Sequence, residues 1–369
     1  MKSKVFLRHL RSNWLILLKV TNTYDLYCRL RFEIDFIKKV GYIKRRKVNL
    51  SKEAVDNLLV VVPSKYQAGW ECGQGNFFYE ICQSAAERFP GMAISIFQVT
   101  NNEIEWKTRL KKFIEGEKPD CIFLYAEIDP DDSGNWTWPQ FFLSIADQWR
   151  GKTVFLLFDS AYPIHRWRAS KLAGITGNAT IASIDRKPTP SLKKGIRHLG
   201  PIFLPMSMQS IQLINQQIVY KVQKENLGAI NISFIGKMYP YRKRIFDQLE
   251  QSGLTVELNP HRNYLEPDSY LSYLTALHLS TFTINLSLAG GVKIKQLKCR
   301  VLETAIFGNV LITDENKFGR MFFRRDSDFV YVKRMNRLSQ EILQEKDWKN
   351  TNKDGRESAY NLARFNFFD

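Results

Sequence analysis

The sequence predicts an α/β protein built from two parallel-sheet domains. Apolar runs of strand length, rich in valine and isoleucine, alternate along the chain with segments of helical length. Continuous apolar strands between helices indicate parallel sheets covered on both faces. The chain has 369 residues, long for one hydrophobic core, and a polar, glutamine-rich stretch at 209–217 separates two such series. We therefore expect two domains.

The first domain is expected over 54–210, with alternating strands and helices. Its predicted strands are 57–63, 92–99, 121–126, 153–159, 179–184 and 202–205. Its predicted helical segments are 74–88 and 105–115. Trp138, in an aromatic run after this domain's third strand, is expected to pack in a loop.

The second domain is expected over 229–345, after a linker at 211–228 that we predict to be helical. Its predicted strands are 230–235, 254–258, 281–286, 309–313 and 328–332. Its predicted helices are 241–252, 268–279 and 298–307. Gly253 is expected to end the first of these helices, and Asp268 to cap the second. A polar tail at 346–369 is expected to cross back onto the first domain.

Positive charge is concentrated in a basic, helical leader at 1–53. The net charge is +17, and the first 50 residues hold thirteen lysines and arginines against three acidic residues. This excess favours an anionic partner. A basic amphipathic leader fits an anionic membrane surface, or it packs against the body. We expect a cytoplasmic protein, peripheral at the inner face of the membrane if the leader binds lipid. Nucleic acid is not expected, because the body's basic residues lie at turns rather than in a recognition helix.

The cysteines and histidines indicate neither a disulfide framework nor a metal. The five cysteines form no CxxC pair, which favours a reducing compartment, and Cys121 and Cys299 are expected to be buried thiols. The five histidines do not cluster at metal-ligand spacing. We expect no metal and no bound cofactor.

Glycine and basic side chains follow the first strand of the second domain. Gly236 and Lys237 end this strand, and Arg242, Lys243 and Arg244 begin the next helix. Glycine lets a phosphate approach the backbone, and a helix N-terminus attracts anions. The alternative is an ordinary turn beside a solvated face.

A second basic turn precedes a helix that contains an acidic residue. Lys298 and Arg300 precede Glu303, whose neighbours are apolar. A carboxylate in such surroundings needs a partner. Ribose hydroxyls are one candidate, and Arg300 at i−3 is the structural alternative.

The stretch ArgValLeuGluThrAlaIlePheGlyAsnValLeuIleThr (300–313) resembles the donor-site helix of GT-B glycosyltransferases, and more narrowly of the CgeB/YkvP-like branch. The resemblance covers 230–332 and includes PheIleGlyLys (234–237), Arg242 and IleAsnLeuSer (284–287). It implies two Rossmann-like domains facing a cleft, and a nucleotide-diphosphate sugar as donor substrate. Glu303 would then bind the donor ribose. The other implied donor-site residues are Gly236, Lys237, Arg242, Asn285, Lys298, Arg300 and Gly308. Where retaining members carry a second glutamate this chain has Lys295, so no stereochemical outcome is assigned.

The first domain offers candidates for the acceptor side. Asp159 and His165 follow its fourth strand, and either can accept a proton from an acceptor hydroxyl. The alternatives are an aspartate that caps the next helix and a histidine satisfied in a loop. Trp70 and Glu71 lie in a glycine-rich loop, where a tryptophan can stack on a sugar; the alternative is a simple turn.

The sequence thus predicts a glycosyltransferase that moves a sugar from a nucleotide donor to a hydroxyl on a glycan, a lipid-linked glycan or a protein. The alternative is a binding protein of the same architecture without turnover.

Overall fold

The computed structural model describes residues 34, 37–38, 55–63, 76–100, 105–127, 137–145, 148–149, 151–160, 162–184, 196–200, 202, 206–260, 269–288, 295–296, 298–314, 323 and 329–332. Packing divides the chain into two compact units, 1–64 with 99–200, and 65–98 with 201–369. Of the expected leader only Ile34, Ile37 and Lys38 are described, all helical. The tail at 346–369 and the proposed cap Asp268 lie outside the described residues. The exact domain bounds, and the cleft between the domains, stay predictions.

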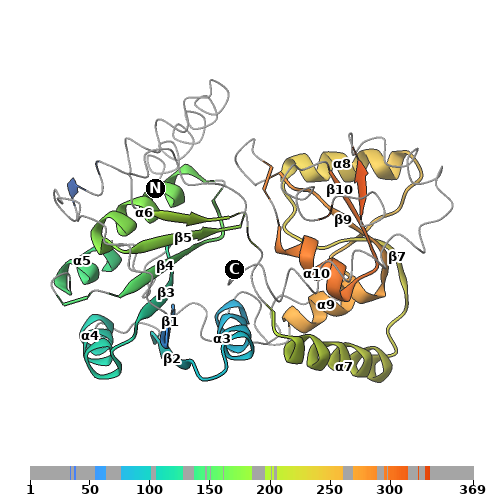
Figure 1. The fold of residues 1–369 in the computed structure, drawn as a ribbon. Coiled ribbons are helices and arrows are strands. Elements are labelled where there is room, and N and C mark those ends of the chain that lie inside the picture. Colours follow the sequence, from blue (N-terminus) through green and yellow to red (C-terminus); the bar gives the residue numbers. More distant parts are fainter. Residues whose placement is uncertain are drawn as a thin grey trace, which may run out of the picture. The chain divides into compact units, whose positions relative to one another are not determined.

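The first sheet has six strands in the order β2-β1-β3-β4-β5-β6. The pairings of β1 with β3 and from there on to β6 are parallel, as predicted. Its strands are β1 (Asn57–Val62), β2 (Ala93–Gln98), β3 (Cys121–Tyr125), β4 (Lys152–Leu157), β5 (Ala179–Ser183) and β6 (Arg197–Leu199). The helices of the first unit are α4 (Trp106–Glu117), α5 (Thr137–Ser144) and α6 (Pro163–Thr176) (Figure 1).

Two expectations for this sheet need correction. The sixth strand is β6, not 202–205: Ile202 is buried but lies outside any strand, and 203–205 are not described. An edge strand pairs on one side only, so a short polar segment such as Arg197–Leu199 can pair with β5. It lacks the apolar run by which the other strands were predicted. Trp138 is packed as expected, but within α5, edge-on to Trp106.

The second sheet has five strands in the order β11-β10-β9-β7-β8, all paired in parallel. Its strands are β7 (Ile230–Phe234), β8 (Glu257–Leu258), β9 (Ser280–Asn285), β10 (Val310–Asp314) and β11 (Val330–Val332). The helices of the second unit are α3 (Asn76–Arg88), α7 (Met208–Glu225), α8 (Pro240–Gln251), α9 (Ser269–Leu279) and α10 (Cys299–Phe307). Only β8 is much shorter than predicted, because Leu254 and Val256 pack against the core without pairing.

One hydrophobic cluster of the second unit lies between its sheet and α8. Phe234, Phe246, Ile284 and Ile312 belong to one buried cluster there. Gly253 ends α8 as predicted, with a left-handed φ of 84°. Its N–H donates to the carbonyl of Glu250, and the next N–H, of Leu254, donates to that of Leu249, which is the Schellman arrangement.

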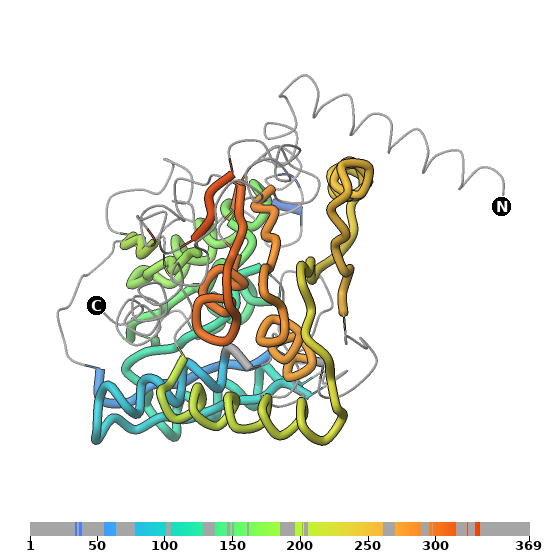
Figure 2. Tube along the Cα trace, turned by 90° about the vertical axis from the view of Figure 1, so that its right-hand side faces the viewer, coloured from blue at the N-terminus to red at the C-terminus, as the bar shows by residue number. Residues whose placement is uncertain are grey.

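Helix α3 meets the start of α7, and the two lie side by side in both views (Figures 1 and 2). Ser207 caps α7 by accepting the N–H of Ser210 at 3.0 Å, and its own N–H donates to the buried carboxylate of Glu80 at 2.9 Å. The N–H groups of Met208 and Gln209 reach the carboxylate of Glu87. Two acidic side chains from α3 therefore satisfy amides at an N-terminus that has no acidic residue of its own.

Two further features bear on the sequence predictions. Cys121 and Cys82 are buried free thiols, whereas Cys299 is only half-buried because it is the first residue of α10. Within the described ranges, no helix is both long enough and apolar enough to cross a membrane.

Candidate functional site

Two arginines from different helices converge on the turn that follows β7. Gly236 lies in this turn with φ of 155°, and a Cβ placed there would come within 2.9 Å of Arg300 Nη2 and 3.6 Å of Arg242 Nη1. Both guanidinium groups also lie over the ring of Phe234, at 5.3 Å for Arg242 and 5.5 Å for Arg300. Glycine suits this position because other residues rarely adopt its φ, and a side chain here would also shift the end of Arg300. The predicted donor-site residues Gly236, Arg242 and Arg300 are thus brought together.

The amide of Gly236 is already engaged by Asn259, which follows β8. Asn259 Oδ1 accepts the Gly236 N–H at 2.7 Å, and its Nδ2 donates to the Gly236 carbonyl at 3.3 Å. Gly236 therefore provides space at this turn rather than a free N–H. The sequence reasoning missed Asn259; the signal was an asparagine after a short apolar stretch, able to adopt the left-handed φ of 51° that it has.

Arg242 is buried, and its contacts give it a structural role. Its Nη1 donates to the carbonyl of Lys237 at 2.6 Å, its Nε to the hydroxyl of Tyr241 at 2.9 Å, and its Nη2 weakly to the carbonyl of Leu286 at 3.5 Å. It also lies over the ring of Tyr239 at 4.9 Å. Each nitrogen has an acceptor within the protein, so Arg242 ties the start of α8 to the turn after β7 and to the end of β9.

Arg300 is less fully engaged. It lies in the first turn of α10 and is half-buried. Its Nε is buried and has no hydrogen-bond partner among the described residues. Arg300 also forms a hydrogen bond with the Tyr273 hydroxyl. Of the two arginines, Arg300 has the donor capacity left for a ligand.

Glu303 is buried one turn further along α10, with 6% of its surface exposed. Its carboxylate accepts the hydroxyl of Tyr270 at 3.1 Å and that of Tyr273 at 2.5 Å, both from α9. Burial, and after it the charge of Glu303, raise the pKa of both tyrosines well above the ordinary value, so their hydroxyls remain donors. A buried carboxylate needs hydrogen-bond donors, and the two tyrosines provide them. Neither tyrosine was predicted from the sequence.

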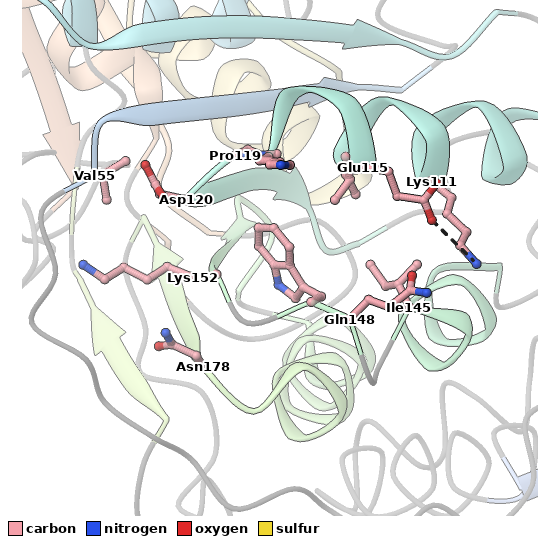
Figure 3. A pocket seen from close by; sticks show the side chains of 13 residues that line it. Val55, Lys111, Glu115, Pro119, Asp120, Ile145, Gln148, Lys152 and Asn178 are labelled. Atoms are coloured by element: carbon pink, nitrogen blue, oxygen red, sulfur yellow. Dashed lines mark ion pairs between the residues drawn. The ribbon is translucent and has the colours of Figure 1, made fainter.

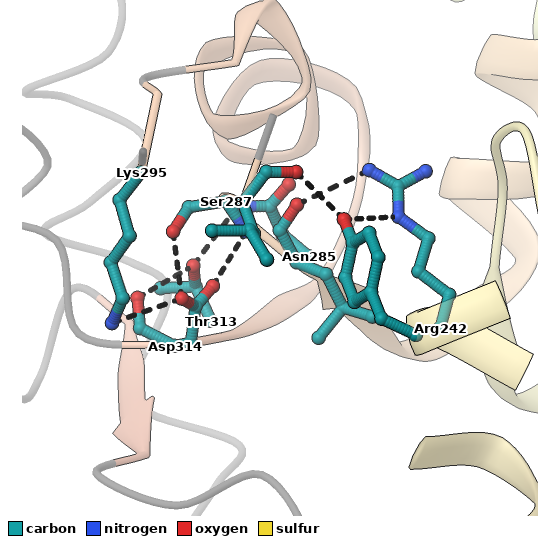
Figure 4. A network of polar contacts seen from close by, with 9 residues as sticks. Arg242, Asn285, Ser287, Lys295, Thr313 and Asp314 are labelled. Atoms are coloured by element: carbon teal, nitrogen blue, oxygen red, sulfur yellow. Dashed lines mark hydrogen bonds and ion pairs between the residues drawn. The ribbon is translucent and has the colours of Figure 1, made fainter. Parts of the chain in front are cut away.

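A second polar network joins the ends of β9 and β10 (Figure 4). Asp314 accepts the N–H of Ser287 at 2.6 Å and its hydroxyl at 2.7 Å, and forms an ion pair with Lys295 at 3.1 Å. Asn285 donates to Thr313 Oγ1 at 2.9 Å, while its buried Oδ1 has no partner among the described residues. Asn285 and Lys295 therefore hold neighbouring strand ends together.

The remaining predicted donor residues lie in different places. Lys237 is exposed, with its ammonium group 5.8 Å from the ring centre of Tyr239. Lys298 is the N-cap residue of α10 and donates to Gln296 at 2.5 Å. Gly308 is at the opposite end of α10, where a Cβ would meet Thr304 at 2.9 Å, so its place in the structure reflects close packing. Trp70 and Glu71 lie outside the described residues.

In the first unit, Asp159 lies beside a buried glutamate at the carboxyl ends of β3 and β4. The Asp159 N–H donates to Glu127 Oε1, and the Tyr125 hydroxyl donates to Glu127 Oε2 at 2.5 Å. Burial first, and the charge of Asp159 second, raise the pKa of Glu127 to about 8. His165, in the first turn of α6, packs edge-on against Tyr162 at 5.9 Å. The sequence reasoning missed Glu127; the signal was an acidic residue directly after an apolar strand.

A pocket of about 510 Å³ lies at the opposite edge of the same sheet (Figure 3). Asp120, Lys152 and Asn178, at the amino ends of β3, β4 and β5, line it together with Trp149 and the end of α4. It contains none of the predicted site residues. Ligands of parallel α/β sheets bind at the carboxyl edge, so we place the candidate site there and not in this pocket.

No group of three or more histidine, cysteine, aspartate or glutamate side chains suited to a metal ion occurs in the part of the chain that the structure describes.

The fold and these edges define a two-unit parallel α/β protein with one cationic and one acidic strand-end site. No protein-family model and no curated protein matches the chain. The CgeB-like assignment therefore stays a prediction.

Several solved structures are similar to the chain. One is Anabaena Alr3699/HepE in complex with UDP-glucose, at 12% identity and a TM-score of 0.46, over 85% of this chain and 96% of that one. Another is a glycosyltransferase from Rickettsia africae ESF-5, at 8% identity and a TM-score of 0.47, over 83% and 93%. A third is the LacI family regulator CCPA from Weissella paramesenteroides with bound glucose, at 14% identity and a TM-score of 0.23, over 78% and 92%. With all TM-scores below 0.5, the function must be argued from this chain's own residues.

Proposed function

We propose that the chain is a GT-B glycosyltransferase that binds a nucleotide-diphosphate sugar at the carboxyl edge of β7 and β9. The observation that carries the proposal is the convergence of Arg242 and Arg300 on the side-chain-free turn at Gly236. Guanidinium groups suit phosphate oxygens because their planar donors match them in geometry and charge. A diphosphate is the anion that two neighbouring guanidiniums fit best.

Arg242 and Arg300 have different roles in this proposal. Arg242 shapes the turn and adds a positive field, because its nitrogens already have acceptors. Arg300 contacts the diphosphate, because it is half-buried and its Nε has no hydrogen-bond partner among the described residues. As the sugar leaves, negative charge grows on the diphosphate, and a fixed guanidinium stabilises that charge without reorganising.

Glu303 keeps its proposed role as the contact for the donor ribose. A carboxylate has about four lone-pair sites and can accept several hydroxyl groups at once, here the two tyrosine hydroxyls and, in this proposal, a ribose hydroxyl. The same tyrosines connect Glu303 to Arg300 through Tyr273, so the ribose and diphosphate contacts share one support.

The acceptor is a hydroxyl compound, a glycan, a lipid-linked glycan or a protein. Contact of the basic leader with an anionic membrane, and a place at its inner face, belong to this proposal. The net charge of +17 supports them.

The test is thermal stabilisation by UDP, GDP, CDP and ADP, with Arg300→Ala beside the wild type. A ligand at 100 times its Kd stabilises by about 2.7 kcal/mol. We expect one diphosphate to raise Tm in the wild type and not in Arg300→Ala. Lys243→Ala is the matched control: it removes an exposed cation of α8 that pairs with Asp247, and should keep the full shift.

A turnover assay then distinguishes a transferase from a binding protein without activity. A transferase hydrolyses the matching sugar nucleotide slowly even without acceptor, whereas a binding protein shows affinity and no turnover. If no diphosphate stabilises the folded wild type, the donor-site proposal is wrong.

A further inference from the structure

The carboxyl edge of the first sheet holds two neighbouring carboxyl groups with different exposure. Glu127 follows β3 and is 5% exposed, while Asp159 follows the adjacent β4 and is half-buried. The strands are paired in register up to Tyr125 and Leu156, which places the segments that carry Glu127 and Asp159 next to each other. One carboxyl is therefore shielded by the protein and the other reaches its surface.

Hydrogen bonds hold Glu127 against the Asp159 backbone. Its Oε1 accepts the N–H of Asp159, and its Oε2 accepts the hydroxyl of Tyr125 at 2.5 Å. The ring of Tyr125 packs against Phe158 at 5.1 Å, which limits the movement of that hydroxyl. The orientation of the Asp159 backbone thus depends on a side chain from the neighbouring strand.

We propose that Glu127 and Asp159 form a paired-carboxyl acid–base site, in which Asp159 exchanges the proton with an acceptor hydroxyl and Glu127 is its positioning residue. The pair is inferred only from the contacts at the carboxyl edge of the first sheet. The identity of the reacting hydroxyl rests on the proposed function.

The proton balance of the step is simple. The acceptor O–H bond breaks and its proton moves to a carboxylate oxygen of Asp159. The acceptor oxygen forms a bond to the anomeric carbon of the donor sugar. The bond from that carbon to the diphosphate oxygen breaks, and its electron pair leaves with the nucleoside diphosphate. Asp159 then loses the proton to solvent.

Burial of Glu127 gives the pair its asymmetry. Negative charges on two neighbouring carboxyl groups oppose each other, and protonation of Glu127 removes this repulsion. The raised pKa of Glu127, about 8, agrees with this arrangement. Besides burial, four neighbouring groups among the described residues influence the pKa of Glu127. They are the hydroxyl of Tyr125 on β3, the backbone N–H groups of Phe158 and Asp159 after β4, and the charge of Asp159.

A direct test is carbon NMR of the full chain with ¹³Cδ-labelled glutamate, followed over pH. We expect one glutamate carboxyl to titrate near pH 8, and its signal to be missing in Glu127→Gln. Asp159→Asn removes a neighbouring negative charge and should lower the pH midpoint of the Glu127 titration. Tyr125→Phe removes a hydrogen bond to the ionised form and should raise it.

The matched control is Asp120→Asn, a carboxyl at the opposite edge of the same sheet that accepts the N–H groups of Asp56 and Asn57. It should leave the midpoint unchanged. An unchanged midpoint in Asp159→Asn would overturn the pairing. Should Glu127→Gln not fold, the wild type and Asp159→Asn decide the question alone.

Activity on the sugar nucleotide gives the second readout. Asp159→Asn should lower kcat about 100-fold or more, without weakening nucleotide binding. Glu127→Gln should remove the change in kcat/KM near pH 8. If kcat falls in neither variant while the NMR shifts are present, the carboxyls are paired but the acid–base role is wrong. If no nucleotide binds, the proposed function fails and the NMR result still stands.

Discussion

The carboxyl edges of the two sheets have the same backbone plan and opposite chemistry. In each, adjacent parallel strands are followed along the chain by helices. The first edge gathers the carboxyls of Glu127 and Asp159, and the second gathers the guanidiniums of Arg242 and Arg300. A shared architecture therefore does not fix the charge of the site; the residues in the segments and helices that follow the strands do.

Each edge satisfies its buried charge with a tyrosine hydroxyl used in opposite ways. At the first edge Tyr125 donates to Glu127, and at the second Tyr241 accepts from Arg242. A hydroxyl can do either, so it suits a buried ion of either sign. The comparison can be tested by removing one charge at a time.

The largest effect is expected from Glu127→Gln, measured as stability against pH. Because the folded-state pKa is raised from 4.5 to about 8, the stability that Glu127 contributes is fully present below about pH 4.5. It is lost as pH rises through 8. The loss is on the order of 5 kcal/mol at 1.36 kcal/mol per pKa unit. Urea unfolding between pH 5 and 9 should show the wild type weakening relative to Glu127→Gln; parallel curves would contradict the raised pKa.

The next effect separates the two arginines of the second edge. Arg242→Ala should cost about 3 kcal/mol, because it leaves buried acceptors without a donor and removes a packed side chain. Arg300→Ala should cost about 1 kcal/mol or less, because its Nε has no described partner and the side chain is half-buried. Urea unfolding of both variants checks the order. Equal losses would show that Arg300 is as structural as Arg242.

The smallest effects are expected at the ends of β9 and β10. Asp314→Ala should cost about 1–2 kcal/mol, because it removes the acceptor of both the Ser287 N–H and its hydroxyl. Lys295→Ala should cost under about 0.5 kcal/mol, because its ion pair is partly exposed. Thermal unfolding in low and high salt distinguishes them: the difference between wild type and Lys295→Ala should nearly vanish at high salt, whereas Asp314→Ala should keep the part due to its two hydrogen bonds with Ser287.

Most of the fold could be predicted because the buried strands are continuous apolar runs. β7, β9 and β10 begin and end within one or two residues of the predicted bounds. The errors fall on edge strands: β6 is polar and β8 consists of two exposed residues. Edge strands bury little side chain, so apolar periodicity says little about them.

The candidate site was less predictable, because its contacts join residues far apart in sequence. Gly236 and Arg300 were named for their local motifs, and their proximity follows from the sheet order. Asn259, Tyr270, Tyr273 and Glu127 were missed because each is an ordinary residue until folding gives it a partner. A spacing motif cannot identify such a residue.

The contact between α3 and α7 bears on how this chain can be divided for experiments. A fragment that begins at residue 201 would carry α7 without Glu80 and Glu87, leaving three amides at its start without these acceptors. The sequence suggests a cut in the linker, but the second unit also includes residues 65–98. A self-sufficient fragment of the second unit should therefore include α3, either as a fusion or by coexpression of that segment.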